Sequence, residues 1–355
     1  MPFESVRTYS FRNLTDSEVC TDGREIFLIG ENGQGKTNFL EAVYFCSFAS
    51  SFKALRDSEM IKKGEDSCSA TARLSSCLVN KISVRIEGGK KGISFDGKTV
   101  VDRKEILEVI PSIVFCHDDM EFISGSPERR RWFFDQTLSL FDYGYIDELR
   151  KFKKLLKTRN TLLKEKSGAT LDLIDYQFVV SGIELMKKRM DASIRFSDIF
   201  NEIYENVSGI GGIHVSYAPS WKSLQAETLV EQLSLRREAD FSFGTSLTGP
   251  QRDRYGFKKD GTEFSVLAST GQRRLLALLL RIAQARMFTW RTGTAPVLLL
   301  DDVLLELDPE KKKNFIQNLP EYQQAFFTFL PGEPYERYQK DKTLMYHVRE
   351  GSIRE

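Results

Sequence analysis

The chain contains 355 residues, which at about 150 residues per domain is enough for roughly two domains. Its 51 lysines and arginines nearly cancel its 50 aspartates and glutamates, and apolar residues make up 41% of it. This composition excludes a disordered tail, a collagen-like fibre and a disulfide-stabilised miniprotein. With a net charge of +1, any nucleic-acid binding requires a local basic patch that acids elsewhere offset.

Hydropathy and cysteine spacing favour a cytoplasmic protein. No apolar run approaches the roughly 18 residues that a membrane helix needs. The first residues, Met1–Glu4, lack the basic stretch of a signal peptide. The five cysteines are scattered and contain no C-x-x-C pair, which predicts reduced thiols and no zinc or disulfide. We therefore expect a cytoplasmic protein that does not associate with membranes.

The first 125 residues predict an α/β unit that begins with a strand, a glycine-rich turn and a helix. The strand covers residues 25–29, the turn 30–35 and the helix 37–49. Alternating apolar residues and glycine turn pairs then predict an antiparallel β layer over residues 68–101. A further buried strand is expected at 112–116.

A helical insertion is predicted next. Ser126 is a favoured N-cap and Pro127 suits the first helical position, so we expect a helix to begin there. Helical spacing continues to about residue 239. Within it, Arg150–Lys166 carries eight basic residues against one acid, Glu165. This segment predicts DNA-phosphate binding, and a solvated helix face is the alternative.

Strands return after residue 240. We expect strands at 255–257 and 263–266, a long apolar helix at about 271–290, and a buried strand at 297–300. A helix, a strand and a terminal hairpin complete the chain. The predicted domains are an α/β body formed by residues 1–125 and 240–355, and a helical arm formed by residues 126–239.

The most specific motif is Gly30-Glu31-Asn32-Gly33-Gln34-Gly35-Lys36-Thr37, which fits the P-loop pattern G-x-x-x-x-G-K-[ST]. Glycines allow the tight turn, and backbone N–H groups at the following helix N-terminus bind phosphate. We expect Lys36 to reach the β- and γ-phosphates and Thr37 to ligate Mg²⁺. No N-K-x-D run for guanine is present.

Two acids end the predicted strand at 297–300. An acid at the tip of a buried strand suits Mg²⁺, so we assign Asp301 to the metal. A second acid beside it can activate the attacking water, so we assign Asp302 as the catalytic base together with Lys36 as the catalytic cation. Asp301 follows Lys36 by about 265 residues, so a large insertion separates the two halves of the site.

A second anion site is predicted at the N-terminus of the long apolar helix. Ser269 and Gly271 lie where N–H groups and the helix dipole attract negative charge. Since the P-loop already serves one nucleotide, this second helix end suggests a γ-phosphate held between two subunits. An ordinary N-cap is the alternative.

Together these motifs are similar to the ABC-type ATPase head of the SMC class, and the fuller pattern resembles the RecF family of bacterial recombination mediators. The resemblance implies an α/β fold, an ABC/SMC-type head with a mixed sheet, an antiparallel β subdomain and an inserted helical arm. The matching runs span nearly the whole chain and are Phe11–Asn13, Gly30–Asn38, Leu40–Ala42, Gly125–Pro127, Arg129–Arg131, Gly249–Pro250, Arg252–Asp253, Gly271–Arg273, Leu299–Val303 and Glu306–Asp308.

The resemblance also implies how two subunits share ATP. Ser269 and Gly271 of one subunit would cap the ATP that the other holds, and residues 115–119 would sense the nucleotide. The nucleotide-contacting residues that the resemblance adds to the P-loop are Arg12, Asn38, Ser269, Gly271, Gln272 and Asp308.

Four positions depart from the family pattern. His117, Gln251 and Arg254 stand where the family usually has Pro, His and Asp. The segment Phe327–Phe329, after the last core strand, lacks the switch histidine. The roles of these positions stay open.

The implied function is ATP-dependent DNA binding in recombinational repair and replication-fork maintenance. The resemblance implies a homodimer that forms with ATP and Mg²⁺ on gapped or junction DNA, a weak DNA-dependent ATPase with slow hydrolysis, and help in RecA loading with RecR and RecO. Another SMC-class repair ATPase, a transporter-type subunit and a non-catalytic ATP-gated DNA clamp are the alternatives. The insertion is too short for long coiled-coil arms, and no membrane partner motif is present. An acid pair shows capacity for hydrolysis and not its rate.

Overall fold

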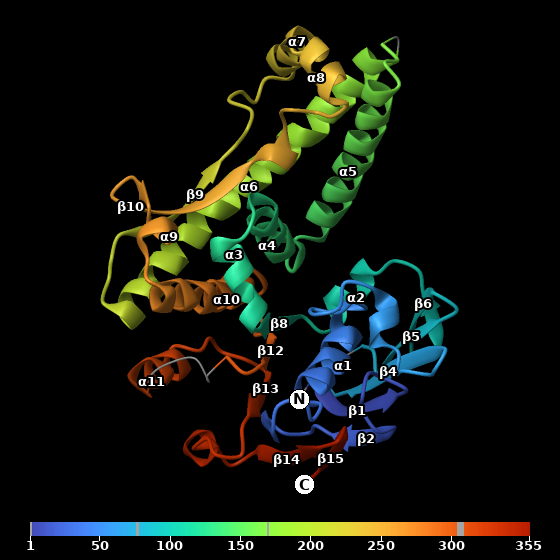
Figure 1. Cartoon of the computed structure of the whole chain (residues 1–355), viewed down its shortest axis with the longest axis vertical. Coiled ribbons are helices and arrows are strands. Elements are labelled where there is room, and N and C mark those ends of the chain that lie inside the picture. The colour runs from blue at the N-terminus through green and yellow to red at the C-terminus, as the bar shows by residue number, and fades with distance from the viewer. Residues whose placement is uncertain (1, 76–77, 169, 304–308) are drawn as a thin grey trace. The chain divides into compact units, whose positions relative to one another are not determined.

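The structure, a computed structural model, describes residues 2–75, 78–168, 170–303 and 309–355. It divides into two compact units (Figure 1). Unit 1 consists of Met1–Asp119 and Phe288–Glu355, and unit 2 of Met120–Met287. Unit 2 therefore includes residues 240–287, which the sequence analysis grouped with the body. The functional boundaries at 125 and 239 remain a prediction, because contacts delimit compact units only.

Unit 1 contains two six-stranded sheets. The antiparallel sheet has the order β2-β1-β4-β5-β6-β7, with β1 (Phe3–Tyr9), β2 (Ser17–Cys20), β4 (Ser67–Leu74), β5 (Lys81–Glu87), β6 (Lys90–Phe95) and β7 (Lys98–Val100). The mixed sheet has the order β15-β14-β3-β13-β12-β8, with β3 (Glu25–Ile29), β8 (Ser112–Phe115), β12 (Val297–Leu300), β13 (Gln324–Phe329), β14 (Thr343–Arg349) and β15 (Ser352–Arg354).

The strands that the sequence predicts in unit 1 are confirmed. β3, β8 and β12 lie at the predicted positions, and all their residues are buried in the parallel part of the mixed sheet. Buried parallel strands are expected to be apolar throughout. In the antiparallel layer, the predicted turn glycines Gly88, Gly89 and Gly97 all have positive φ. Glycine adopts this conformation without steric cost.

Helix α1 (Lys36–Phe48) packs against both sheets of unit 1, touching β1, β4 and β5 on one side and β8 and β13 on the other. This double contact explains why its sequence is apolar nearly all round. Unit 1 also contains α2 (Lys104–Val109) and α11 (Pro309–Gln317). The position of α1, directly after β3, aims its N-terminus at the carboxyl edge of the parallel strands.

Unit 2 is mainly helical. Its helices are α3 (Glu121–Ser124), α4 (Pro127–Ser139), α5 (Tyr143–Lys164), α6 (Leu171–Ser208), α7 (Ala226–Leu235), α8 (Arg237–Phe243), α9 (Phe264–Leu267) and the first part of α10 (Thr270–Thr292). The predicted start of α4 is confirmed, because the Ser126 side chain accepts a hydrogen bond from the Arg129 N–H. Phe152, Phe178 and Trp221 belong to a core cluster between α5, α6 and the loop before α7.

Two expectations for unit 2 are wrong. The sequence predicts helices and breaks up to residue 239, whereas Ile213–Ala218 forms strand β9. Its partner is β10 (Arg254–Lys259), about 40 residues away, so local spacing did not reveal it. Residues 263–266 were expected to form a strand, but only Glu263 belongs to β11 (Thr262–Glu263), and α9 begins at Phe264. Within the described chain, no helix is both long and apolar enough to cross a membrane.

Candidate nucleotide site

The loop between β3 and α1 has the backbone of a phosphate cradle. Gly33 and Gly35 have φ of 79° and 118°, in the region that favours glycine. At Gly30 the requirement is space, because a Cβ there would lie 2.4 Å from the carbonyl oxygen of Val348 in β14. Among the described residues, no side chain caps the N-terminus of α1 and no acid occupies its first turn. The N–H groups of this turn are therefore open to an anion.

Lys36 folds back over the cradle. Its buried ammonium donates to the carbonyl oxygens of Gly30 at 2.6 Å and Glu31 at 3.1 Å. An ammonium has three N–H donors, so one remains for a phosphate oxygen. The loop thus holds a fixed positive charge beside open backbone donors.

The structure brings Thr37 and Asp301 together across 264 residues of chain. The Thr37 hydroxyl donates to Oδ1 of Asp301 at 2.8 Å. Burial raises the pKa of Asp301 to about 6, although the Thr37 hydrogen bond acts against the rise. Burying an ionised carboxylate without a cation is unfavourable. A hydroxyl and a carboxylate are hard oxygen ligands of the kind Mg²⁺ prefers, so these two groups fit that ion.

Asp302 is held by Thr328, in the segment 327–329. Thr328 of β13 accepts from the Asp302 N–H at 2.7 Å and donates to its Oδ1 at 2.8 Å. Asp302 has φ of 52°, an uncommon conformation for a residue other than glycine. Two hydrogen bonds to one hydroxyl therefore fix a strained residue beside Asp301.

Four hydrogen bonds that the sequence does not predict support the cradle. The Asn13 amide donates to the Gly33 carbonyl at 3.3 Å and accepts from Asn38 at 2.7 Å. The turn between β14 and β15 approaches Gln34: the Gly351 N–H donates to its carbonyl at 2.8 Å, and the Glu350 N–H donates to its side chain at 2.7 Å. These residues come from both ends of the chain, so no local motif indicates them.

Arg12 is engaged in an ion pair. Its Nε and Nη2 donate to the buried Glu41 carboxylate at 2.7 and 2.8 Å, and this hydrogen bonding raises the pKa of Arg12. The pair ties the loop after β1 to α1. A phosphate contact from Arg12 stays a prediction.

Ser269 and Gln272 form a reciprocal cap at the N-terminus of α10. The Gln272 side chain accepts from the Ser269 N–H at 2.8 Å, and the Ser269 hydroxyl accepts from the Gln272 N–H at 3.3 Å. This is a capping box, and it stabilises the helix end. Around Gly271, a Cβ would meet nothing within 4 Å. The helix end is open there. It belongs to unit 2, whereas the P-loop belongs to unit 1. Asp308 lies outside the described residues.

The chain matches the model of the RecF/RecN/SMC N-terminal domain family over residues 3–351. It is 40% identical over 348 residues to the DNA replication and repair protein RecF of Treponema pallidum, covering 98% of this chain and 99% of that protein. The chain belongs to the RecF family. The RecF protein of Leptospira interrogans (strain 56601) is 28% identical over 97% of this chain and 96% of that protein.

Solved structures agree with the RecF assignment. A structure of the recombination mediator protein RecF-ATP in the RecFOR pathway is 26% identical, with a TM-score of 0.88 over 99% of this chain and 96% of that one. An Smc head domain from Pyrococcus furiosus is 19% identical, with a TM-score of 0.57 over 100% of this chain and 96% of that one. The second likeness shows the fold alone. The α/β ATPase head of the SMC/ABC class is thereby confirmed.

The structure shows the surroundings of the three residues that depart from the family pattern, His117, Gln251 and Arg254. Gln251 donates to the Thr248 carbonyl at 2.8 Å, and Arg254 is an exposed residue of β10. His117 begins a short 3-10 turn, His117–Met120. Gln251 therefore stabilises its own loop, and Arg254 offers a charge to solvent.

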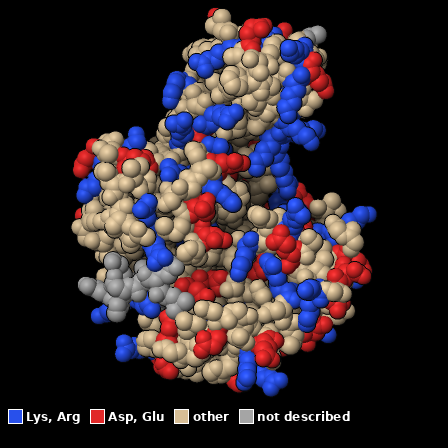
Figure 2. Space-filling model, in the orientation of Figure 1, with Lys and Arg blue, Asp and Glu red and all other residues tan. Residues whose placement is uncertain are grey.

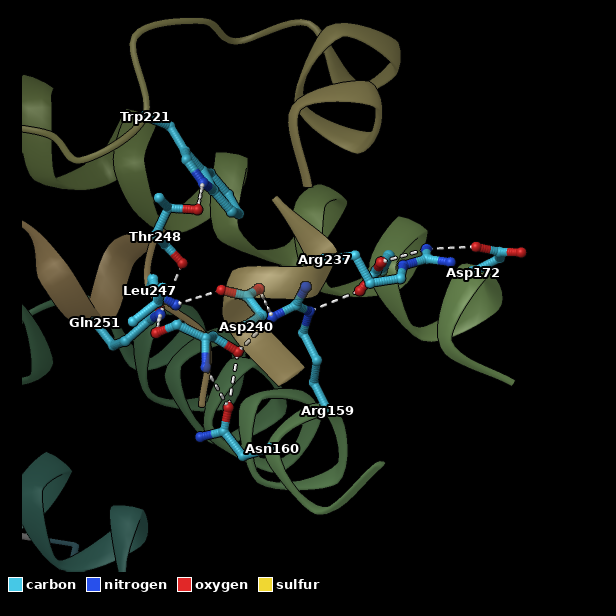
Figure 3. A network of polar contacts seen from close by, with 11 residues as sticks. Arg159, Asn160, Asp172, Trp221, Arg237, Asp240, Leu247, Thr248 and Gln251 are labelled. Carbon is cyan, nitrogen blue, oxygen red and sulfur yellow. Dashed lines mark hydrogen bonds and ion pairs between the residues drawn. The ribbon is translucent and has the colours of Figure 1, made fainter. Parts of the chain in front are cut away.

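The basic segment divides into an exposed face and one buried base. Lys and Arg gather along α5 on the molecular surface (Figure 2). The exposed bases of the segment are Arg150, Lys151, Lys153, Lys154, Lys157, Lys164 and Lys166. Arg159 points inward instead, with Nε 2.6 Å from Asp175 and Nη1 2.6 Å from Asp240 (Figure 3). Of the eight basic residues in the segment, seven are therefore exposed and one is buried.

Proposed function

We propose that this chain is an ATP-dependent DNA-binding protein of recombinational repair and replication. The observation that carries the proposal is the 2.8 Å contact between Thr37 and Asp301, which joins the cradle to the acid pair. Nucleotide binding there supplies the switch, and the RecF relatives supply the biological setting. DNA repair and replication are in the names of those relatives.

ATP is bound by the cradle and Mg²⁺ by Thr37 and Asp301. When present, Mg²⁺ neutralises charge on the β- and γ-phosphates. Lys36 holds the same phosphates by its free N–H. Asp302 orients and deprotonates the attacking water through Oδ2, because Thr328 occupies Oδ1.

ATP joins two copies of the chain into a homodimer. Ser269, Gly271 and Gln272 of one copy contact the γ-phosphate bound by the other, and Asp308 lies at the same interface. The open surroundings of Gly271 support this role, because a phosphate can approach the N–H groups of α10 closely. The two carboxylates and the P-loop then lie in one shared site.

The exposed face of α5 is a DNA-contacting surface. Its six helical bases project within one half of the helix circumference, and Arg150 and Lys164 span about 21 Å along the axis. Within the described residues, Lys151, Lys153, Lys154 and Lys157 have no ion-pair partner. Free cations along one face suit a row of phosphates. The proposed outcome is a dimer on gapped or junction DNA that helps RecA loading with RecR and RecO.

Duplex-DNA binding with and without ATP–Mg²⁺ tests the proposal. Fluorescence anisotropy should show binding that depends on ATP in the wild type and is lost in Lys36→Arg. Lys63→Arg is the matched control, since Lys63 is exposed in unit 1. Binding that ignores both ATP and Lys36 would separate the nucleotide site from DNA and end the proposal.

Three further variants separate hydrolysis from dimerisation. Asp302→Asn and Thr328→Val should slow ATP hydrolysis while ATP affinity stays unchanged, because both act on the water-activating carboxylate. Ser269→Arg should prevent ATP-dependent dimers in analytical ultracentrifugation while single-copy ATP binding persists. Unchanged hydrolysis in Asp302→Asn would leave a non-catalytic ATP-gated clamp as the better description.

A further inference from the structure

Unit 2 contains a cavity of about 810 Å³ that is strongly basic. Its wall is formed by the start of α4, the loop after β9, the C-terminal end of α7 and the segment 247–254. The charged side chains that line it are Glu128, Arg131, Lys222, Arg236, Arg252 and Arg254. Five cations therefore face one carboxylate.

The five cations are not neutralised by the protein. Among the residues that the structure describes, none of them forms an ion pair. The nearby Arg189 differs, because it is paired with Asp135 at 2.9 Å and Asp253 at 2.8 Å. Burial and the charge of Arg189 lower the pKa of Arg131, although the charges of Glu128, Asp135 and Asp253 act against this shift. An anion in the cavity would relieve this repulsion.

The cavity is preformed. Asp253 accepts from the Ser220 N–H at 2.8 Å, and the Ser220 hydroxyl accepts from the Gly249 N–H at 3.1 Å. The Trp221 indole donates to Thr248 at 3.3 Å. These bonds join the loop after β9 to the segment that carries Arg252. Rigid walls keep the arginines in place before a ligand arrives.

A second network fixes the segment from behind (Figure 3). The Leu247 N–H donates to Asp240 at 3.1 Å, and the Ser246 N–H donates to Asn160 at 2.9 Å. Arg159 donates to Ser246 at 2.8 Å. The buried base of α5 thereby supports the wall of the basic cavity.

We infer that this cavity binds a phosphate group of a DNA backbone. This inference rests on the proposed function, since it assigns a phosphate contact to the DNA that the dimer binds. No aromatic side chain is among the described residues that line the cavity, so it offers no surface on which a base stacks. Arginine forks match phosphate oxygens in pairs. The cavity accepts the backbone, and specificity for base sequence is not expected from it.

The test is the salt dependence of duplex-DNA binding in the presence of ATP–Mg²⁺. The double variant Arg252→Gln with Arg254→Gln removes two exposed charges that have no ion-pair partner among the described residues. Loss of the one phosphate contact in the cavity should lower the slope of log K against log salt by about 0.9. At about 0.15 M salt this corresponds to roughly 5-fold weaker binding. Lys258→Gln, on the same strand as Arg254 but outside the cavity, should keep the wild-type slope.

The outcomes distinguish a failure of the cavity assignment from a failure of the proposed function. Wild-type ATP affinity and melting temperature in the double variant would show that the fold is intact. If the wild type binds duplex with ATP and the double variant has the same slope, the cavity assignment fails alone. If the wild type binds no duplex at all, the proposed function and the cavity assignment both fail. A Glu-rich peptide whose binding weakens in the double variant, with an unchanged DNA slope, would assign the cavity to an acidic protein segment and overturn the inference.

Discussion

The P-loop of unit 1 and the basic cavity of unit 2 both present positive charge to a phosphate, but they are built in different ways. The P-loop is one run of eight residues in which backbone N–H groups and a single lysine make the site. The cavity collects side chains from four separate segments and depends on buried side-chain bonds to hold them. A site made from one contiguous backbone segment should tolerate changes in its surroundings. A site assembled from side chains of several segments depends on the buried bonds that hold those segments in place.

The largest expected effect comes from that support. Arg159→Ala leaves Asp240 buried without its cation and Asp175 with Arg237 alone, and breaking a buried pair in this way costs about 3–5 kcal/mol. Urea unfolding followed by circular dichroism should show this loss. Lys154→Ala, an exposed site on the same helix, should change the free energy of unfolding by less than about 0.5 kcal/mol. Equal effects of the two variants would show that the network does not stabilise unit 2.

The corresponding change in the P-loop should weaken ligand binding with little effect on the fold. Lys36→Ala removes one charge-assisted hydrogen bond to ATP, worth about 1.5–3 kcal/mol, or roughly a 10- to 150-fold weaker affinity. Isothermal titration with ATP measures it, and Lys63→Ala is the exposed control in unit 1. Unchanged ATP affinity in Lys36→Ala would remove Lys36 from the site.

The sequence indicates contiguous features well and assembled ones poorly. Strand β3, the P-loop glycines and the α4 cap are local, and their patterns predicted them correctly. Thr37 and Asp301 could be paired from sequence only because each belongs to a separate local motif with a known chemistry. Asn13 and Thr328 each lie in a short segment that resembles the family, but neither segment indicates the contact that its residue makes. Their roles follow from contacts between distant segments. Strand β9 was missed for the same reason, since its partner is far along the chain.

The turn at Gly351 tests whether the P-loop is as self-contained as the comparison suggests. A Cβ there would lie 2.0 Å from the Asn13 carbonyl oxygen, and Gly351 has φ of 79°. Gly351→Ala should therefore displace the turn from Gln34. Gly64→Ala is the matched control, because Gly64 also has positive φ, at 95°, but a Cβ there would meet nothing within 4 Å.

Both alanines carry the conformational cost of positive φ, about 1–2 kcal/mol. Only Gly351→Ala adds the clash with Asn13. We expect this clash to lower the free energy of unfolding by a further ~1 kcal/mol or more, as overpacking does in protein cores. ATP binding should also weaken several-fold. Thermal unfolding and ATP titration of the two variants measure the difference. If Gly351→Ala binds ATP as tightly as Gly64→Ala, the C-terminal turn does not support the cradle.

The smallest effect concerns the proton that competes with Mg²⁺ at Asp301. Its pKa is raised from 3.8 to about 6 by burial, and the charged groups facing it are Asp302, Lys36 and Lys53. A raised carboxyl pKa means that the stability associated with this group is fully present below about pH 4 and is lost as the pH rises through 6. Mg²⁺ affinity follows the opposite course, because the ionised carboxylate is the ligand.

Below pH 6 the Mg²⁺ affinity of the ATP-bound wild type should therefore fall by up to about tenfold per pH unit, or 1.4 kcal/mol, through Asp301 alone. ATP phosphates also gain protons in this range, so the comparison must be made with Asp301→Asn, which retains only their contribution. Mg²⁺ titrations between about pH 5 and 7 should give a steeper dependence in the wild type. Parallel curves for the two proteins would mean that Asp301 is not a metal ligand. The P-loop would then bind ATP without a contribution from the acid at the end of β12.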